Sequence, residues 1–239
     1  MPSWSIHLAI AKRINDKLNL DKDLFYYGNL LPDVDKSNLI SRDEAHYANH
    51  TIPFPNCPKE YMIDIDLFLK DYKENLSNPL ILGYYCHLLA DNFYNNEIYS
   101  NKWIQDANNN IIGIKLKNGK ILNIDIEDKK RQKRKYKHKD FELYGKYLFK
   151  EKKIELPKDD IAIKNNIKYL KNRFVNDELV DYRLNYLNNG FIKFNKLKFN
   201  ELLFQHNYKL FSKNELDRIF DNCVDMILKK IMEQLCKNK

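Results

Sequence analysis

Apolar side chains recur along most of this chain at the spacing of helical faces. Residues 3–18 place Ile6, Ala9, Ile10 and Ile14 three and four residues apart, which predicts an amphipathic helix. Only six glycines and seven prolines interrupt the chain, which favours long helices over a many-turned β-sandwich. The same apolar period predicts further helices at 22–28, 60–76, from 79 over about twenty residues, 140–150, 159–175, 177–188 and 212–235.

Two of these helices carry recognisable capping residues at their starts. Asn78 precedes Pro79, and proline suits the first helical turn because it lacks an N–H that would be unpaired there. Ser212 and Glu215 have the spacing of a capping box, in which each side chain accepts a hydrogen bond from the backbone N–H of the other. The two helices are therefore expected to begin at these residues.

Two short segments rich in isoleucine, residues 111–116 and 121–126, flank the dipeptide Asn118-Gly119. This dipeptide favours a tight type I′ turn between antiparallel strands. We therefore predict a small β-hairpin near 111–126.

The rest of the chain shows no internal repeat and no flexible linker. Residues 34–58 contain three closely spaced prolines and are expected to be mostly irregular. We predict a mainly α fold class in a single domain that spans residues 1–239.

Charge and cysteine content narrow the class of protein. The formal net charge is +8, and residues 129–139 form a basic segment that could attract polyanions or be a solvated loop, as most charge runs are. The four cysteines contain no CxxC pair, which predicts reduced and mostly buried thiols. We find no signal-peptide pattern and no apolar run near the roughly 18 residues that span a membrane. We therefore expect a cytoplasmic protein without a transmembrane segment.

His87 and Asp91 lie four residues apart in the helix predicted after Pro79. This step places both side chains on one face, one turn apart, where an imidazole and a carboxylate can hold one metal ion. Their neighbours are almost all apolar, so both side chains are expected to be buried. A buried carboxylate needs a cation or several donors. A metal ion would satisfy both residues, and so would a buried hydrogen-bonded pair.

Three more residues are candidate ligands, each with an ordinary alternative. His7 lies in the apolar start of the first predicted helix and would equally suit a core histidine. Asp33 follows Pro32, a position that turn and N-cap aspartates commonly take. His46 lies in a segment expected to be irregular, where a histidine is usually exposed.

In their order along the chain, these residues resemble the zinc-dependent phospholipase C family, which is akin to the P1 nucleases. The resemblance covers about the first 100 residues and extends loosely to about 150. It rests on the segments Ser5-Ile6-His7-Leu8, Gly28 to Pro32-Asp33, His46-Tyr47 and His87-Leu88-Leu89-Ala90-Asp91.

The resemblance implies a multi-helix phospholipase C/P1 nuclease-like fold that binds two or three Zn²⁺ ions, although other transition metals accept the same ligands. It implies that Asp33, His46, His87 and Asp91 share one cluster, and that His7 joins Asp91 at a neighbouring ion. Asp33 would hold or deprotonate the attacking water, which makes it the candidate catalytic residue. The family hydrolyses phosphodiesters, and zinc supports this chemistry by lowering the pKa of water and neutralising phosphoryl charge.

The sequence departs from the family pattern in two respects. Secreted family members bind a metal through the free amine of an N-terminal tryptophan, whereas Trp4 is internal and does not align with it. The family has a histidine six residues after the HxxxD aspartate, where this chain has Glu97. Its later HxxxE pair corresponds to His138 and Glu142, which could equally belong to a solvated charged stretch. Glu97, His138 and Glu142 are candidate further metal ligands.

The sequence therefore predicts a metal-dependent phosphoester hydrolase of phospholipase C type. Its partner would be a phosphodiester small molecule, a phospholipid headgroup or nucleic acid. A nuclease-like phosphodiesterase is one alternative. Another is a non-catalytic metal-binding module of the same fold that binds an anionic ligand, because an active lipase inside the cell would threaten its own membrane. A histidine–aspartate phosphohydrolase needs adjacent His and Asp residues, and this dipeptide does not occur.

Overall fold

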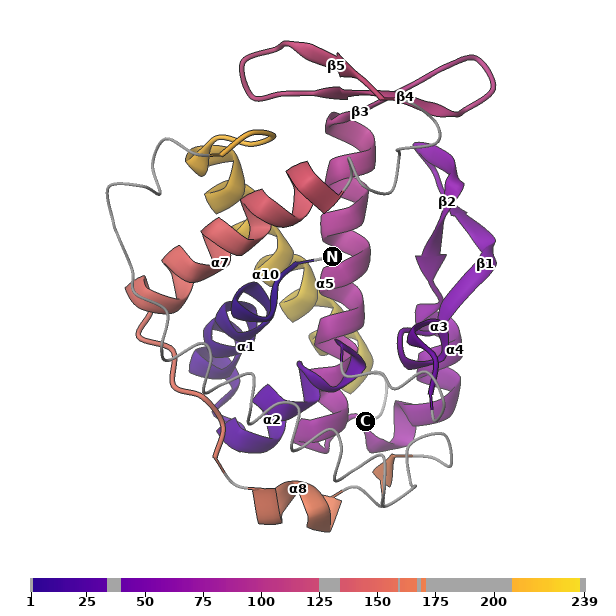
Figure 1. Ribbon diagram of the computed structural model, residues 1–239. Helices are drawn as coiled ribbons and strands as arrows, with labels where there is room; N and C mark the ends of the chain where they lie inside the picture. Colours follow the sequence, from indigo (N-terminus) through magenta and orange to yellow (C-terminus); the bar gives the residue numbers. More distant parts are fainter. Residues whose placement is uncertain are drawn as a thin grey trace.

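The protein has the mainly α fold that the apolar period predicts, built around one long central helix. In Figure 1 this helix, α5 (Pro79–Asn101), stands upright, with helices on one side and a two-stranded ribbon on the other. Every residue of α5 from Leu80 to Asn92 is buried, because neighbouring elements surround it. The computed structural model describes residues 2–33, 40–124, 134–158, 160–166, 169–170 and 208–236.

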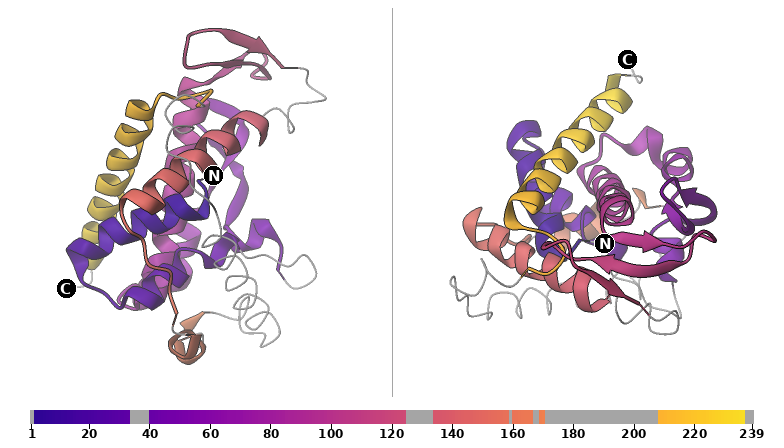
Figure 2. Two further views of the ribbon diagram at one scale, coloured as in Figure 1. Left: turned by 60° about the vertical axis from the view of Figure 1, so that its left-hand side comes forward. Right: turned by 90° about the horizontal axis from the view of Figure 1, so that it is seen from above.

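Three helices lie along one side of α5. They are α1 (Trp4–Leu18), α7 (Lys139–Glu151) and α10 (Lys213–Cys236). Helix α1 contacts both of the others, and the left view of Figure 2 shows it running alongside α7. Both predicted caps are confirmed. The Asn78 side chain accepts a hydrogen bond from Leu80 N at 2.9 Å. The Ser212 N–H donates to Glu215 Oε2 at 2.6 Å, and the Glu215 N–H donates to Ser212 Oγ at 3.2 Å.

The other side of α5 holds a β-ribbon that the sequence did not predict. Strands β1 (Ala48–Phe54) and β2 (Cys57–Ile63) pair antiparallel where we expected irregular chain and the start of a helix. Helix α4 (Ile65–Tyr72) therefore begins later than the predicted residue 60.

A tertiary contact explains why the pattern was misleading there. The Asn92 side chain of α5 pairs with the backbone of Ile63, accepting from its N–H at 2.8 Å and donating to its carbonyl at 2.9 Å. Prolines fit this ribbon because a two-stranded sheet has outer edges that need no N–H donor. Asp64 then caps α4 by accepting from Leu67 N at 2.9 Å.

The predicted hairpin near 111–126 is confirmed, and a third strand joins it. Strands β4 (Ile111–Lys115) and β5 (Ile121–Asn123) pair antiparallel, and β3 (Trp103–Gln105) pairs with β4 directly after α5. The turn differs from the prediction, because Gly119 has a positive φ of 82° while Asn118 does not. A type I′ turn requires a positive φ at both residues.

Several short elements complete the part of the chain that the structure describes. The helix predicted at 159–175 is represented by α8 (Asp160–Asn166), while residues 171–207, including the predicted helix 177–188, lie outside the described residues. No described helix is long and apolar enough to cross a bilayer. The remaining elements are α2 (Lys22–Gly28), η1 (Leu31–Asp33), α3 (Arg42–Ala45), η2 (Lys73–Asn75) and η3 (Arg134–His138).

The thiols and the basic segment can be compared with their predictions. Cys57, Cys86 and Cys223 are buried and free, as predicted, and Cys236 is free and exposed. In the described part of the basic segment, Lys137 is buried and its Nζ donates to Asn95 Oδ1 on α5 at 2.5 Å. This lysine is therefore not part of a fully solvated loop.

Helices α2 and α5 approach so closely that only glycine fits between them. A Cβ atom on Gly28 would overlap the Leu80 carbonyl, and one on Gly83 would overlap the Phe25 carbonyl. The contact brings the end of α2, including the backbone of Asn29, against the turn of α5 that precedes His87.

Replacing Gly83 by alanine should destabilise the fold by about 1–3 kcal/mol, because the added methyl group forces two backbones apart. Helix propensity alone would change stability in the opposite direction, by up to about 1 kcal/mol. Chemical denaturation of Gly83→Ala beside Asn222→Ala, an exposed position on α10, measures the difference. Equal stability of Gly83→Ala and the parent protein would contradict the close approach.

Candidate metal centre

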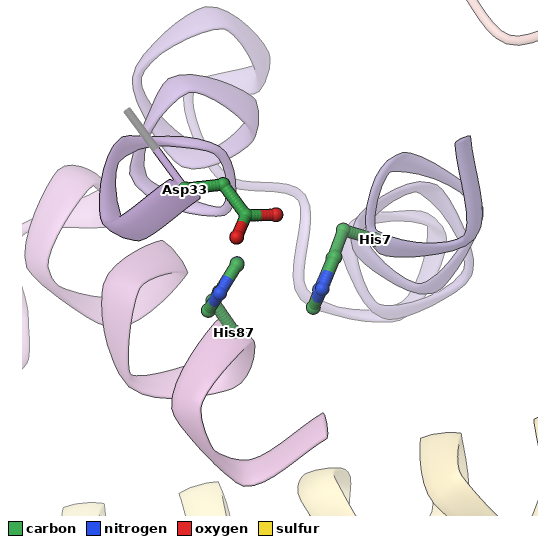
Figure 3. Close-up of side chains that lie close together, drawn as sticks. All are labelled: His7, Asp33 and His87. Atoms are coloured by element: carbon green, nitrogen blue, oxygen red, sulfur yellow. The ribbon is translucent and has the colours of Figure 1, made fainter. Parts of the chain in front are cut away.

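Five of the predicted residues come together beside the middle of α5. We call His7, Asp33, His46, His87 and Asp91 the His–Asp cluster. His7 comes from α1, Asp33 ends η1, His46 follows α3, and the last two lie one turn apart on α5. Figure 3 shows that His7, Asp33 and His87 project toward one another from three separate elements.

The ligand atoms of His46, His87 and Asp91 lie close to the separations that zinc requires. Four nitrogen and oxygen ligands about 2.0–2.1 Å from a tetrahedral zinc ion lie about 3.3–3.4 Å from one another. His46 Nε2 lies 3.3 Å from Asp33 Oδ1, 3.4 Å from His87 Nε2 and 3.7 Å from Asp91 Oδ2. His87 Nε2 lies 3.7 Å from the same Asp91 oxygen. The atoms of His46, His87 and Asp91 thus lie within 3.7 Å of one another, and Asp33 adjoins them through His46. Two overlapping groups of three side chains could hold an ion: His46 with His87 and Asp91, and His7 with Asp33 and His87.

Backbone carbonyls turn both imidazoles so that Nε2 faces the cluster. His87 Nδ1 lies 2.7 Å from the carbonyl oxygen of Asn29, and His46 Nδ1 lies 3.0 Å from that of Arg42. A carbonyl only accepts, so each Nδ1 carries the proton and each Nε2 presents a lone pair. Two lone pairs that face each other at 3.4 Å repel unless a cation lies between them.

Four buried polar atoms of the cluster have no hydrogen-bond partner. Both side-chain oxygens of Asp91 and both ring nitrogens of His7 are in this position, and both residues are fully buried. His7 Nε2 lies 3.4 Å from Asp91 Oδ1, but the geometry does not make a hydrogen bond. A buried carboxylate without donors is costly, and a metal ion removes this cost. The donor set therefore fits a metal ion.

Charge and burial set the protonation states that metal binding requires. Burial lowers the pKa of His87 to about 3, and the neighbouring His7 contributes to this lowering, so His87 is neutral near pH 7. Burial alone would raise the pKa of Asp33, but the adjacent His46 and the nearby His87 and His7 imidazoles outweigh burial and lower it. The pKa of Asp91 is lowered in the same way, chiefly by His87 and His7 against the effect of burial. Both carboxylates are therefore ionised.

Among the described residues, three other predicted ligands are not grouped with the cluster. Glu97 lines a separate pocket of about 280 Å³ beside α10 and the turn after β4. His138 and Glu142 are on α7 and the turn before it, where Glu142 pairs with Lys146 at 2.5 Å. The buried acid of that region is Asp140, whose carboxylate accepts from the N–H groups of residues 209–211. The described residues thus bring these three side chains neither to the cluster nor into a second metal group.

Sequence reasoning missed two residues that contact the cluster. Asn29 acts through its backbone carbonyl, for which no side-chain pattern exists. Arg42 lies one helical turn before His46, and its side chain reaches Asp33 at 2.9 Å. Because Arg42 lies four residues before His46, the sequence alone could have placed its side chain on the same helical face as His46.

Acid should destabilise the folded protein through His87. In chelator-treated protein, His87 alone should lower the free energy of unfolding by about 2 kcal/mol between pH 7 and pH 5. The unfolded chain protonates His87 near the ordinary histidine pKa of 6.5, whereas the folded protein does so only near a pKa of about 3. This contribution is complete above pH 6.5 and is lost progressively as the pH falls toward 3.

Urea denaturation at the two pH values measures this loss. The variant His87→Asn should show a smaller pH dependence than the parent, and the exposed control His50→Asn should retain the parent's dependence. Identical pH dependence in the parent and His87→Asn would contradict the assignment.

Comparison with known protein families supports a zinc-dependent identity. The family described as zinc dependent phospholipase C matches residues 6–193, a range that contains the whole His–Asp cluster. No curated protein and no solved structure matches the chain. The family is zinc-dependent, and the buried cluster can hold a metal ion. The chain belongs to the zinc-dependent phospholipase C family.

Proposed function

We propose that this protein hydrolyses a phosphodiester of phospholipid type, with zinc held by Asp33, His46, His87 and Asp91. The observation that carries the proposal is the buried group of His46, His87 and Asp91, whose ligand atoms lie 3.4–3.7 Å apart, with Asp33 Oδ1 3.3 Å from His46 Nε2. Membership of a phospholipase C family supports the substrate class.

Asp91 is placed to serve a second ion together with His7. Its Oδ2 atom faces the imidazoles of His46 and His87, at 3.7 Å from each Nε2. Its Oδ1 atom lies instead 3.4 Å from His7 Nε2. One carboxylate thus presents its two oxygens to two neighbouring positions, which supports a site for two ions that share Asp91.

Asp33 is the cluster side chain best placed to meet water and substrate. It is 9% exposed, whereas His7, His87 and Asp91 are fully buried. Zinc, when bound, supplies a Lewis acid that lowers the pKa of water and neutralises phosphoryl charge. Because its pKa is lowered, Asp33 remains ionised and accepts a hydrogen bond from water well, but it retains a proton poorly. We therefore assign Asp33 to orienting the attacking water.

A non-catalytic metal-binding module is the second candidate. It is favoured by the separation of Glu97, His138 and Glu142 from the cluster, because the resemblance implies that these residues complete the metal set. A protein that binds zinc tightly without turning over any phosphodiester would have this function. A nuclease-like phosphodiesterase draws no comparable support from the described residues.

The proposed site should be visible in the metal content of the purified protein. Protein purified without a histidine tag should contain about one to two equivalents of zinc per chain by plasma mass spectrometry. His87→Ala should lose most of it, because the variant removes a ligand that both candidate metal groups share. His50→Ala, an exposed histidine paired with Asp43, should retain the parent content. Parent protein that stays metal-free after zinc addition would refute the metal centre.

The proposed role of Asp33 can be tested by measuring hydrolysis. At saturating zinc, Asp33→Asn should lower kcat on bis(p-nitrophenyl) phosphate and on phosphatidylcholine vesicles about 100-fold or more, because a neutral amide oxygen replaces the charged carboxylate that orients the water. Asp43→Asn, an exposed carboxylate, is the matched control and should act as the parent does. A single-stranded DNA substrate tests the nuclease alternative. Zinc-loaded parent protein that hydrolyses none of the three substrates would favour the non-catalytic module.

A further inference from the structure

The guanidinium of Arg42 lies against the solvent-facing edge of the His–Asp cluster. Its Nη2 atom donates to Asp33 Oδ1 at 2.9 Å and lies 3.2 Å from His46 Nε2. Among the Lys and Arg side chains that the structure describes, Arg42 is the one that forms an ion pair with a cluster residue. The contact therefore places a permanent positive charge beside two of the proposed zinc ligands.

The hydrogen bond to His46 uses the lone pair that a metal ion would need. His46 Nδ1 carries its proton toward the carbonyl of Arg42, so Nε2 can only accept. Arg42 Nη2 donates to that Nε2, because guanidinium has donors only. A nitrogen lone pair can bind a zinc ion or accept this N–H, but not both.

The Arg42 side chain borders solvent, which leaves room for it to turn away from the cluster. The Arg42 side chain is 42% exposed, while the Asp33 and His46 side chains beneath it are 9% and 5% exposed. The short helix α3 holds the backbone of Arg42 through a capping box between Ser41 and Glu44. The backbone carbonyl can therefore keep orienting His46 while the side chain turns outward.

We infer that Arg42 is an exchangeable counter-cation of the metal centre, which zinc displaces from Asp33 and His46 as it binds. This inference rests on the proposed metal site. Without zinc, the guanidinium offsets the charge of the ionised Asp33 and so stabilises the fold. With zinc, the same hydrogen bonds must break first, so Arg42 weakens the apparent affinity for the ion.

These two effects give Arg42 a signature that a merely structural residue lacks. Removing a structural arginine would lower both the stability and the zinc affinity. Removing an exchangeable counter-cation should lower the stability of zinc-free protein and raise the zinc affinity. The change in zinc affinity should be about ten-fold or more, as expected for losing a charge-assisted hydrogen bond.

The experiment compares full-length parent, Arg42→Ala, Arg42→Lys and Arg13→Ala. Arg13 is a matched control, because its side chain is 47% exposed and lies 3.9 Å from Asp221, away from the cluster. Competition with a chromogenic chelator measures the zinc dissociation constant, and thermal unfolding in excess EDTA measures zinc-free stability. Circular dichroism confirms that each variant is folded.

We expect Arg42→Ala to bind zinc about ten-fold more tightly than the parent and to unfold at a lower temperature in EDTA. Arg42→Lys keeps the charge but not the planar fork, so both values should lie between those of the parent and Arg42→Ala. Arg13→Ala should bind zinc as the parent does.

Two outcomes would overturn the inference, and they are distinguishable. Zinc affinity that is unchanged or weaker in Arg42→Ala would show that Arg42 does not compete with the ion, while leaving the metal site intact. Absence of zinc binding by the parent and by every variant would remove the proposed metal site, and the role of Arg42 with it.

Discussion

The arrangement of the metal centre depends on one buried carboxylate, Asp91, which has no hydrogen-bond donor. Asp91 lies on a fully buried stretch of α5, and neither of its oxygens has a hydrogen-bond partner. Its pKa is nevertheless lowered, so burial alone does not neutralise it. An ionised group in such surroundings needs a cation. Imidazoles from three elements surround Asp91, and their nitrogen lone pairs also require a cation. Metal binding therefore explains the position of each cluster residue more simply than a core of buried polar side chains does.

The scaffold positions these side chains through backbone contacts as much as through side-chain packing. The glycine contact between α2 and α5 brings the Asn29 carbonyl to His87, which fixes the tautomer of that imidazole. The capping box of α3 performs the same task for His46 through the carbonyl of Arg42. Such outer contacts hold metal ligands in orientation and tune their basicity. The side chain of Arg42 then adds a charge at the solvent edge, which links access to the site with its electrostatics.

The five cluster residues could be predicted from sequence because each lies in a short motif whose order resembles a known family. The long helices were predictable as well, since caps at Asn78 and Ser212 are local signals. The β1–β2 ribbon was not, because its end is fixed by Asn92, which is 29 residues from Ile63. Glu97, His138 and Glu142 matched the expected spacing, but spacing does not show which way a side chain faces. Asn29 contributes only its backbone, which no residue pattern encodes.

We propose that one zinc ion lies among Asp33, His46, His87 and Asp91. Anomalous diffraction at the zinc absorption edge, on crystals of zinc-loaded protein, tests this position directly. We expect a strong anomalous peak about 2.0–2.2 Å from Nε2 of His46 and of His87 and from a carboxylate oxygen of Asp33 and of Asp91. A second peak between His7 and Asp91 would match the shared carboxylate. A zinc peak elsewhere, with none at the His–Asp cluster, would contradict the proposed metal centre.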